Sequence, residues 1–208
     1  MIDVTGRALA SIVLAAGLAA PAVAAEQGPW QIRGRALGIF PDADATIGAL
    51  PGANVDIGAT ATPELDISYF LTANIAVELV LATARVGVKV TNPDISLGNV
   101  WILPPTLTVQ YHFAPDGAIR PYVGVGVNYT MFYGDKQPPG GFASSVDYDN
   151  AWGLALQAGV DIPVDDHWSM NVDVKKIFLS TDATVNGAVK ADVDIDPLLV
   201  GVGIGYRF

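Results

Sequence analysis

The last eleven residues, Leu198-Leu-Val-Gly-Val-Gly-Ile-Gly-Tyr-Arg-Phe208, decide the fold class of this chain. Every second residue in this stretch is apolar, and the residues between are one leucine, three glycines and one arginine. Because side chains alternate between the two faces of a β-strand, one face of this segment is apolar and the other is small or polar. A strand of this kind at the end of a chain is typical of a transmembrane β-barrel, in which lipid covers one face and the lumen lies at the other.

Seven earlier windows of eleven residues repeat the alternation. They cover residues 30–40, 61–71, 75–85, 103–113, 121–131, 152–162 and 168–178. A tilted membrane strand needs about 9–11 residues. The connections alternate between short (72–74, 114–120, 163–167) and long (41–60, 86–102, 132–151, 179–197). The sequence therefore predicts an all-β fold, an eight-stranded antiparallel transmembrane β-barrel with short periplasmic turns and long extracellular loops.

The composition of the 208 residues favours strands over membrane helices. Apolar residues make up 51% and charged residues 15%. Beyond the N-terminus there is no uncharged apolar run of about 18 residues, which a membrane helix would need. The chain has no cysteine, which excludes disulfides, thiolate metal sites and cysteine nucleophiles. The formal net charge of −10 argues against nucleic acid as a partner.

Residues 1–25 have the features of a signal peptide. Arg7 precedes an apolar stretch over residues 8–20, and small residues at 22–25 offer a cleavage site. An N-terminal membrane anchor is the alternative, but the stretch is short, rich in alanine and followed by Pro21. We therefore expect a signal peptide at 1–25, a barrel domain at 26–208 and a location in the outer membrane.

Strand parity assigns charged side chains to the lower, periplasmic part of the lumen. A buried charge without a partner is costly, so charges of both signs are expected to pair there as a polar plug. The predicted plug consists of Arg33, Arg35, Glu64, Asp66, Glu78, Asp173, Lys175 and Arg207. A soluble lipocalin-like barrel, with its apolar face inward, is the alternative. It would leave these charges in solvent and the terminal aromatic residue unexplained.

Apolar inward residues follow above the charged ones and predict an apolar cup that is open to the outside. The candidate ligand-binding residues are Leu37, Ile39, Val80, Trp101, Trp152 and Leu199. An eight-stranded barrel has an interior just wide enough for side chains or one small ligand. Alternatively, the aliphatic residues only fill the barrel, and the two tryptophans are anchors at the membrane interface.

Five segments of these strands are distinctive. They are Asn74-Ile-Ala-Val-Glu-Leu79, Leu103-Pro-Pro-Thr-Leu107, Arg120-Pro-Tyr-Val-Gly-Val-Gly-Val-Asn-Tyr-Thr130, Trp152-Gly with Gln157 and Gly159-Val-Asp161, and Gly205-Tyr-Arg-Phe208. Together they resemble the OmpW family of Gram-negative outer-membrane proteins. The resemblance implies an eight-stranded barrel that binds and takes up small hydrophobic molecules and releases them sideways into the membrane. It also implies that the barrel-assembly machinery reads the terminal Phe208.

These features predict a barrel that binds small hydrophobic molecules and has no continuous water pore. Charges paired across the lower lumen would block a route downwards, so an exit between strands is physically easier. Pro63, Pro104 and Pro105 lack the backbone N–H that strand pairing uses, and they mark the expected opening near the outer rim. The predicted partners are outer-membrane lipids and lipopolysaccharide, a small hydrophobic ligand and the barrel-assembly machinery. No cofactor or metal is expected.

Two other functions are compatible with a small outer-membrane barrel. A structural or adhesive barrel would act through its extracellular loops. A lipid A-modifying enzyme would need a histidine near the outer rim, but His112 and His167 fall at the periplasmic end, so no enzymatic activity is expected. Lys176 has outward parity, either because its stem snorkels towards lipopolysaccharide phosphates or because a β-bulge reverses its parity.

Overall fold

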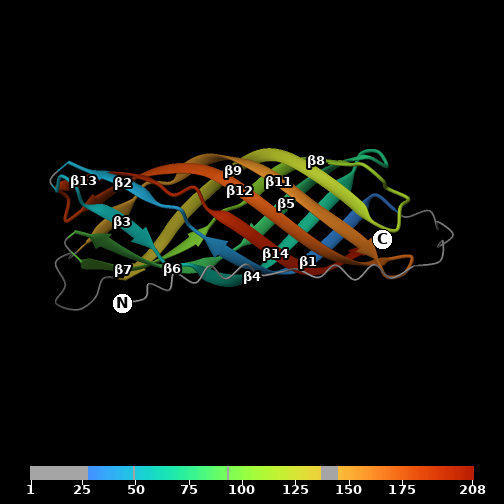
Figure 1. Ribbon diagram of the computed structural model, residues 1–208, viewed down its shortest axis with the longest axis horizontal. Coiled ribbons are helices and arrows are strands. Elements are labelled where there is room, and N and C mark those ends of the chain that lie inside the picture. Colours follow the sequence, from blue (N-terminus) through green and yellow to red (C-terminus); the bar gives the residue numbers. More distant parts are fainter. Residues whose placement is uncertain (1–27, 49, 93, 137–144) are drawn as a thin grey trace, which may run out of the picture.

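The protein forms one elongated β-barrel in a computed structural model that describes residues 28–48, 50–92, 94–136 and 145–208 (Figure 1). The signal peptide predicted for residues 1–25 lies outside the described residues. Gly28 donates its backbone N–H to the carbonyl oxygen of Phe208, so the two described ends of the chain meet at one end of the barrel.

No helix long and apolar enough to cross a bilayer is present among the residues that the structure describes.

Eight long strands close the membrane part of the barrel. They are β1 (Trp30–Phe40), β4 (Thr60–Phe70), β5 (Ile75–Ala82), β8 (Thr106–His112), β9 (Arg120–Lys136), β11 (Ala151–Pro163), β12 (Trp168–Val185) and β14 (Leu198–Arg207). Each pairs antiparallel with the next, and β14 pairs with β1 from Phe40↔Leu198 to Gln31↔Arg207. Closure pairs the backbone groups that lipid cannot satisfy. The predicted eight-stranded barrel is confirmed.

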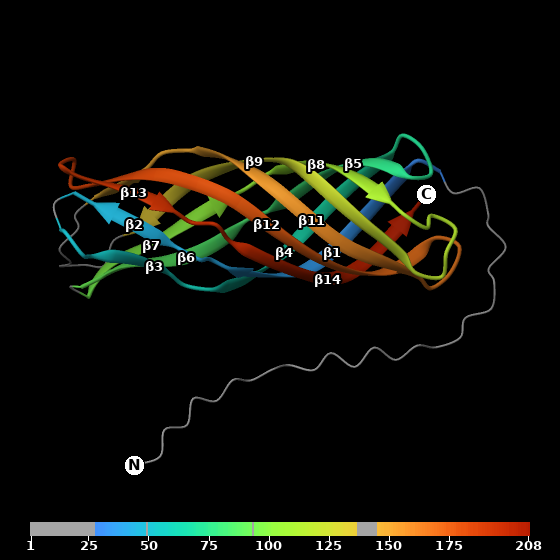
Figure 2. The same ribbon diagram turned by 45° about the horizontal axis from the view of Figure 1, so that its top comes forward.

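The four long connections contain strands of their own, which the sequence analysis did not predict. These strands are β2 (Asp44–Ile47), β3 (Asn54–Ile57), β6 (Ala84–Thr91), β7 (Ile95–Leu103), β10 (Val146–Tyr148) and β13 (Val189–Asp194). Together with the parts of β9 and β12 that lie farthest from Phe208, they extend the wall beyond the membrane barrel (Figure 2). We call this direction, away from Phe208, the upper end of the barrel. The alternation continues in them, but their outward residues are polar, as Arg85 and Lys89 of β6 illustrate. A search for eleven-residue windows with an apolar outer face therefore does not detect the strands of the extension.

The extension consists of two sheets that face each other. One contains β2, β13, upper β12 and β10, and the other contains β3, β6, β7 and upper β9. Their inner faces form a single apolar cluster that includes Val55, Val88, Val100, Val146 and Val193. The sequence forms this structure because β-branched residues alternate with polar ones, which gives each sheet one apolar and one polar face.

Aromatic residues cover the outer face at both ends of the membrane barrel. At the end that carries Phe208, the Trp168 and Tyr206 rings lie 5.0 Å apart. At the other end Trp152 packs on Tyr129 at 4.7 Å, and Trp101 stacks on Tyr133 at 6.3 Å. Aromatic side chains favour the two membrane–water interfaces, so these pairs mark the limits of the lipid-facing band.

The register of β12 resolves the one alternative that the sequence left open for Lys176. The β12–β14 register runs without a shift through Lys176, whose Nζ donates to the carbonyl oxygen of Asp196 at 2.5 Å, so no bulge reverses its parity. In the short 164–167 turn, Asp165 accepts hydrogen bonds from the backbone N–H groups of Trp168 and His167. These two donors hold the pKa of Asp165 below its ordinary value.

Candidate functional site

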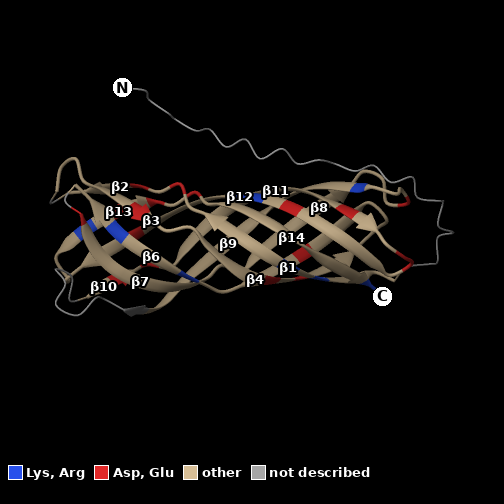
Figure 3. Cartoon of the chain, turned by 60° about the horizontal axis from the view of Figure 1, so that its bottom comes forward, with Lys and Arg blue, Asp and Glu red and all other residues tan. Residues whose placement is uncertain are grey.

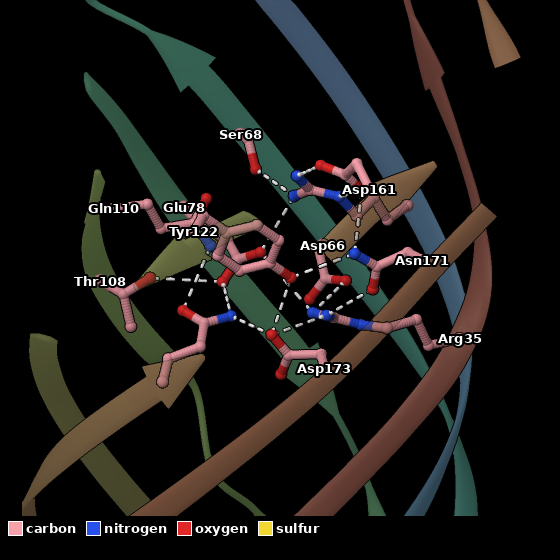
Figure 4. A network of polar contacts seen from close by, with 12 residues as sticks. Arg35, Asp66, Ser68, Glu78, Thr108, Gln110, Tyr122, Asp161, Asn171 and Asp173 are labelled. Atoms are coloured by element: carbon pink, nitrogen blue, oxygen red, sulfur yellow. Dashed lines mark hydrogen bonds and ion pairs between the residues drawn. The ribbon is translucent and has the colours of Figure 1, made fainter. Parts of the chain in front are cut away.

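Figure 3 shows charged residues along the strands of the membrane barrel. Those whose side chains are buried form a polar plug in the lower lumen. Arg33 of β1 lies at its centre. The Nη2 and Nε atoms of Arg33 donate to the two carboxylate oxygens of Asp161 at 2.7 and 3.2 Å. Nη1 donates to Ser68 Oγ at 2.9 Å and lies 3.2 Å from Glu78 Oε1. Arg33 therefore ties β1 to β4, β5 and β11 across the lumen. Its partners Ser68, Glu78 and Asp161 are labelled in Figure 4.

Arg35, two residues further along β1, contacts four carboxylates, and the longest of these contacts joins its Nη2 to Glu78 Oε1 at 3.6 Å. Its Nε lies 2.7 Å from Glu64 Oε1, its Nη2 lies 2.5 Å from Asp66 Oδ2, and its Nη1 lies 3.3 Å from Asp173 Oδ2. Lys175 Nζ lies 3.0 Å from Asp173 Oδ1 and 3.5 Å from Glu64 Oε1. All of these side chains are almost fully buried, so each charge depends on its neighbours for compensation.

Neutral side chains complete the network. Tyr122 Oη and Gln157 Nε2 each donate to Asp173 Oδ2 at 2.8 Å. Gln157 Nε2 also lies 2.9 Å from Glu78 Oε2, to which Thr108 Oγ1 donates at 3.2 Å. Because β8, β9, β11 and β12 supply these groups, the network spans the whole lumen.

Two glycines make room for the largest side chains of the plug. A Cβ atom at Gly203 of β14 would collide with the carbonyl oxygen of Gly34 and with Arg35. A Cβ atom at Gly159 would collide with the Tyr122 ring. The small inward residues of β14 therefore leave the space that the Arg35 side chain occupies.

An apolar chamber lies above the plug. Its cavity has a volume of about 190 Å³ and lies between the two sheets of the extension. Ile39, Ile177 and Leu199 line its floor, and beneath them Leu37 and Ala155 complete a second buried cluster. Along β1 the inward residues thus change from two arginines to two aliphatic residues. The lumen is polar and filled below, and apolar and hollow above.

The predicted ligand-binding residues separate into three groups. Ile39 and Leu199 line the cavity. Leu37 and Val80 are buried in the lumen but lie outside the cavity lining. Trp101 and Trp152 lie on the outer surface, with 36% and 70% of their area exposed, so the structure does not support ligand contact for them. Their outward parity and their packing on Tyr133 and Tyr129 identify them as interface residues.

The predicted plug residues are brought together, with one correction. Arg33, Arg35, Glu64, Asp66, Glu78, Asp173 and Lys175 belong to the network described above. Arg207 does not, because its guanidinium stacks over the Phe70 ring at 3.7 Å and its Nε donates to the Gly28 carbonyl at 3.0 Å. Strand parity placed Arg207 on the correct face but could not show that it lies below the network.

Sequence reasoning missed most of the cavity lining. The walls come from residues assigned to loops, among them Val55, Val86, Val88, Leu97, Ala183 and Val193. The continued alternation of Val86, Val88 and Val90 was the signal that could have found them. Tyr122, Gln157 and Asn171 also had inward parity, but neutral residues give no sign of the charges that they contact.

The wall is interrupted at Thr83, between β5 and β6. The β5–β8 ladder ends at Val80↔Thr106 and the β6–β7 ladder begins at Ala84↔Ile102, with no ladder pair in the described residues between. Pro104 and Pro105 lie opposite this gap on one side. Pro63 lies opposite on the other, where the β4–β5 ladder ends. Prolines cannot donate to a ladder, so all three predicted prolines border one break.

Side chains bridge this break. Thr62 Oγ1 donates to the Thr83 carbonyl at 2.5 Å, and Thr83 Oγ1 lies 3.2 Å from the Ile102 carbonyl and 2.6 Å from Tyr133 Oη. Within the lumen, Asn128 Nδ2 lies 3.2 Å from the carbonyl oxygen of Pro104, which lines the cavity. The break therefore borders the chamber and is held by hydroxyl and amide groups.

The closed barrel, its lipid-facing aromatic bands and its plugged lumen define an outer-membrane β-barrel protein. The sequence model of the OmpW family matches residues 26–208, and the chain belongs to that family. The uncharacterized outer-membrane protein y4mB of Sinorhizobium fredii (strain NBRC 101917 / NGR234) is 45% identical over 191 residues, which cover 89% of this chain and 82% of that protein. Its name and the fold agree on a location in the outer membrane.

Two further proteins are similar to this chain. The dibenzothiophene metabolism operon protein PahQ of Pseudomonas aeruginosa is 37% identical over 129 residues, which cover 61% of this chain and 60% of PahQ. The crystal structure of the outer membrane protein OprG from Pseudomonas aeruginosa superposes with a TM-score of 0.82 and 29% identity, covering 89% of this chain and 98% of OprG. OprG thus has the same barrel fold.

Proposed function

We propose that this protein binds small hydrophobic molecules in the chamber, assists their uptake and releases them sideways into the membrane. The observation that carries this proposal is an apolar cavity of about 190 Å³ directly above a buried, charged plug. An apolar cavity of about 150 Å³ can stay dry and bind benzene. The chamber is therefore large enough for one small aromatic or aliphatic hydrocarbon.

The plug supports a sideways exit and argues against a route straight down. An apolar molecule moving down the lumen would have to separate Arg33 from Asp161 and Arg35 from Glu64. Separating buried ion pairs without replacing their partners costs several kcal/mol for each pair. The break at Thr83 has no ladder hydrogen bonds to separate and borders the chamber. We therefore assign the exit to this break.

The relative PahQ supports the choice of ligand class. Its name places it in an operon for the metabolism of dibenzothiophene, which is an apolar aromatic compound. The chamber of this chain, with the Phe132 and Tyr148 rings stacked at 5.5 Å on its wall, suits a ligand of similar chemistry. His112 lies between the Phe70 and Tyr122 rings at the periplasmic end of the barrel, opposite the chamber. This position gives no support to lipid A modification by His112.

The same proposal includes two partners in the envelope. The exposed aromatic bands that contain Trp152 and Trp168 support contact with lipids and lipopolysaccharide at the two interfaces. Phe208, which directly follows β14 and is 55% exposed, is available to the barrel-assembly machinery.

A disulfide across the break tests the sideways exit. The chain has no cysteine, so the double variant Leu81→Cys with Pro105→Cys can form only one disulfide. That disulfide would cross the break, because the two residues lie on opposite sides of it. Leu79→Cys with Leu107→Cys, a directly opposed pair in the intact ladder, is the matched control. We expect oxidation to reduce naphthalene uptake by cells carrying the first pair to that of cells lacking the protein, and reduction to restore it. Undiminished uptake with the first pair fully oxidised would contradict the proposal.

A further inference from the structure

A second interruption of the wall lies higher, in the extension. Above the pair Ile39↔Thr60 the chain diverges, and β2 pairs with β13 while β3 pairs with β6. The Asp42 N–H donates to the Ile195 carbonyl, and the Gly58 N–H donates to the Gly87 carbonyl, so the two connecting segments bond to opposite sheets. In the described part of the chain no backbone pair joins β2 to β3, which are the two ends of the strand order. We call this interruption the β2–β3 seam.

Among the described residues, the Asn54 side chain joins the two sides of the seam. Asn54 Nδ2 donates to Asp44 Oδ1 at 2.8 Å, and Asn54 Oδ1 accepts a hydrogen bond from the Ala45 N–H at 2.7 Å. The same oxygen accepts from the Val55 N–H at 2.7 Å, which fixes the orientation of the amide. A partly exposed side chain is a weak substitute for a ladder of backbone bonds, because water competes for its donors and acceptor.

The seam opens onto the chamber. Ile47 on the β2 side and Val55 and Ile57 on the β3 side all line the cavity, as does Pro41 at the base of the seam. A small parting of the two sheets at Asn54 would therefore connect the cavity with the outside without breaking a backbone ladder.

The chemistry of the outer face distinguishes this seam from the break at Thr83. Asp44, Thr46 and Asp56 are exposed beside the seam, and Asp56 pairs with Lys89 at 2.9 Å. The break at Thr83 lies instead beside the exposed rings of Trp101 and Tyr133. Charged residues belong outside the membrane and aromatic residues at its interface. The seam therefore faces the aqueous and polysaccharide layer, whereas the break faces lipid.

We infer that the β2–β3 seam is the entrance through which a small hydrophobic molecule reaches the chamber, and that Asn54 is its clasp. The inference rests on the proposed function and adds a direction to it. Ligand enters from the polar outer layer through the seam and leaves into lipid at the break.

A charge swap tests the clasp. Asn54→Asp keeps the oxygen that accepts from Ala45 but replaces the amide donor by a second carboxylate beside Asp44. Like charges across neighbouring strands repel, so this variant opens the seam. The double variant Asp44→Asn with Asn54→Asp restores one donor between the two positions and closes it again.

The measurement uses a thiol inside the chamber. Ala183 lines the cavity and is 5% exposed, and the chain has no other cysteine, so Ala183→Cys gives a single buried target. The thiolate adds to the C=C bond of N-phenylmaleimide, a small apolar reagent, and the neighbouring carbon takes a proton from water. The thioether that forms is counted by mass spectrometry. Asp182→Cys, on the outer face of the same strand, is the matched control. Gel mobility of unheated protein verifies that each variant is folded.

We expect Asn54→Asp to raise the alkylation rate in the Ala183→Cys background about threefold or more, as repulsion between opposed like charges predicts. High salt should reduce the increase, because it screens exposed charges. The double variant should react at the original rate, and the Asp182→Cys control should react equally in all backgrounds. An unchanged alkylation rate in the Asn54→Asp variant would contradict the assignment of the seam as the entrance. A chamber thiol that saturating naphthalene fails to protect, with the clasp intact, overturns the proposed function instead.

Discussion

Arg35 Nε lies 2.7 Å from Glu64 Oε1, and both side chains are buried in the lumen. The same guanidinium contacts Asp66 and Asp173, so Arg35→Met removes one of the cations of this buried carboxylate cluster, while Lys175 stays beside Asp173. Removing one partner of a buried ion pair costs about 3–5 kcal/mol. We expect the free energy of unfolding, measured by urea titration in lipid vesicles, to fall by that amount.

Arg207→Met is the control for this prediction. Arg207 stacks on Phe70 at the edge of the barrel and is only half-buried, so its loss should cost about 1 kcal/mol. Equal losses for the two variants would mean that the buried network contributes no more than an edge contact, and the plug would not be the barrier that we describe.

The hydroxyl of Thr83 is expected to hold the break closed. Thr83→Val keeps the shape of the side chain but removes the contacts with the Ile102 carbonyl and Tyr133 Oη. The two lost hydrogen bonds together cost about 2 kcal/mol, at about 1 kcal/mol each, so amide hydrogen exchange at residues 81–84 should speed up about thirtyfold. Exchange at residues 77–79, in the intact ladder of the same strand, should not change. An equal change in exchange rate at residues 77–79 and 81–84 would show that the break is no weaker than the intact ladder.

Filling the chamber should abolish uptake without harming the barrel. Ala191 faces the cavity from β13, whereas its neighbour Asp192 faces outward. Ala191→Phe should therefore reduce naphthalene uptake by cells to the background level, and Asp192→Phe should leave it unchanged. If both variants support normal uptake, a role through the extracellular loops becomes the better explanation.

Phe208 is expected to matter for assembly more than for stability. Its backbone N–H donates to the Trp30 carbonyl at 3.0 Å, a contact that Phe208→Ala retains. The exposed ring is lost, so the variant should accumulate more slowly in the outer membrane in pulse-labelled cells yet unfold at the same urea concentration. Leu198→Ala, on the same face at the other end of β14, is the control and should assemble at the normal rate.

The sequence predicted the membrane barrel well because lipid imposes an apolar face on every strand. Parity alone placed Arg33, Glu78 and Lys175 in the lumen, and the missing N–H groups of Pro104 and Pro105 marked the break. The strands of the extension were not predicted, because their outer face meets water and carries polar residues. A segment with Lys89 between Val88 and Val90 was therefore assigned to a loop. Strand parity shows which face a side chain is on, but not its position along the barrel axis or its contacts. For this reason Arg207 was assigned to the plug, and the hydrogen bonds of Asn54 across the seam could not be predicted.

Protection of a chamber thiol by naphthalene tests the central claim most directly. Full-length protein carrying Ala183→Cys is alkylated with N-phenylmaleimide at increasing naphthalene concentrations, with Asp182→Cys as the outer-face control. The account predicts a saturable slowing of alkylation at the chamber thiol and a constant rate at the control. A chamber thiol that reacts at the same rate at every naphthalene concentration up to the solubility limit would contradict it.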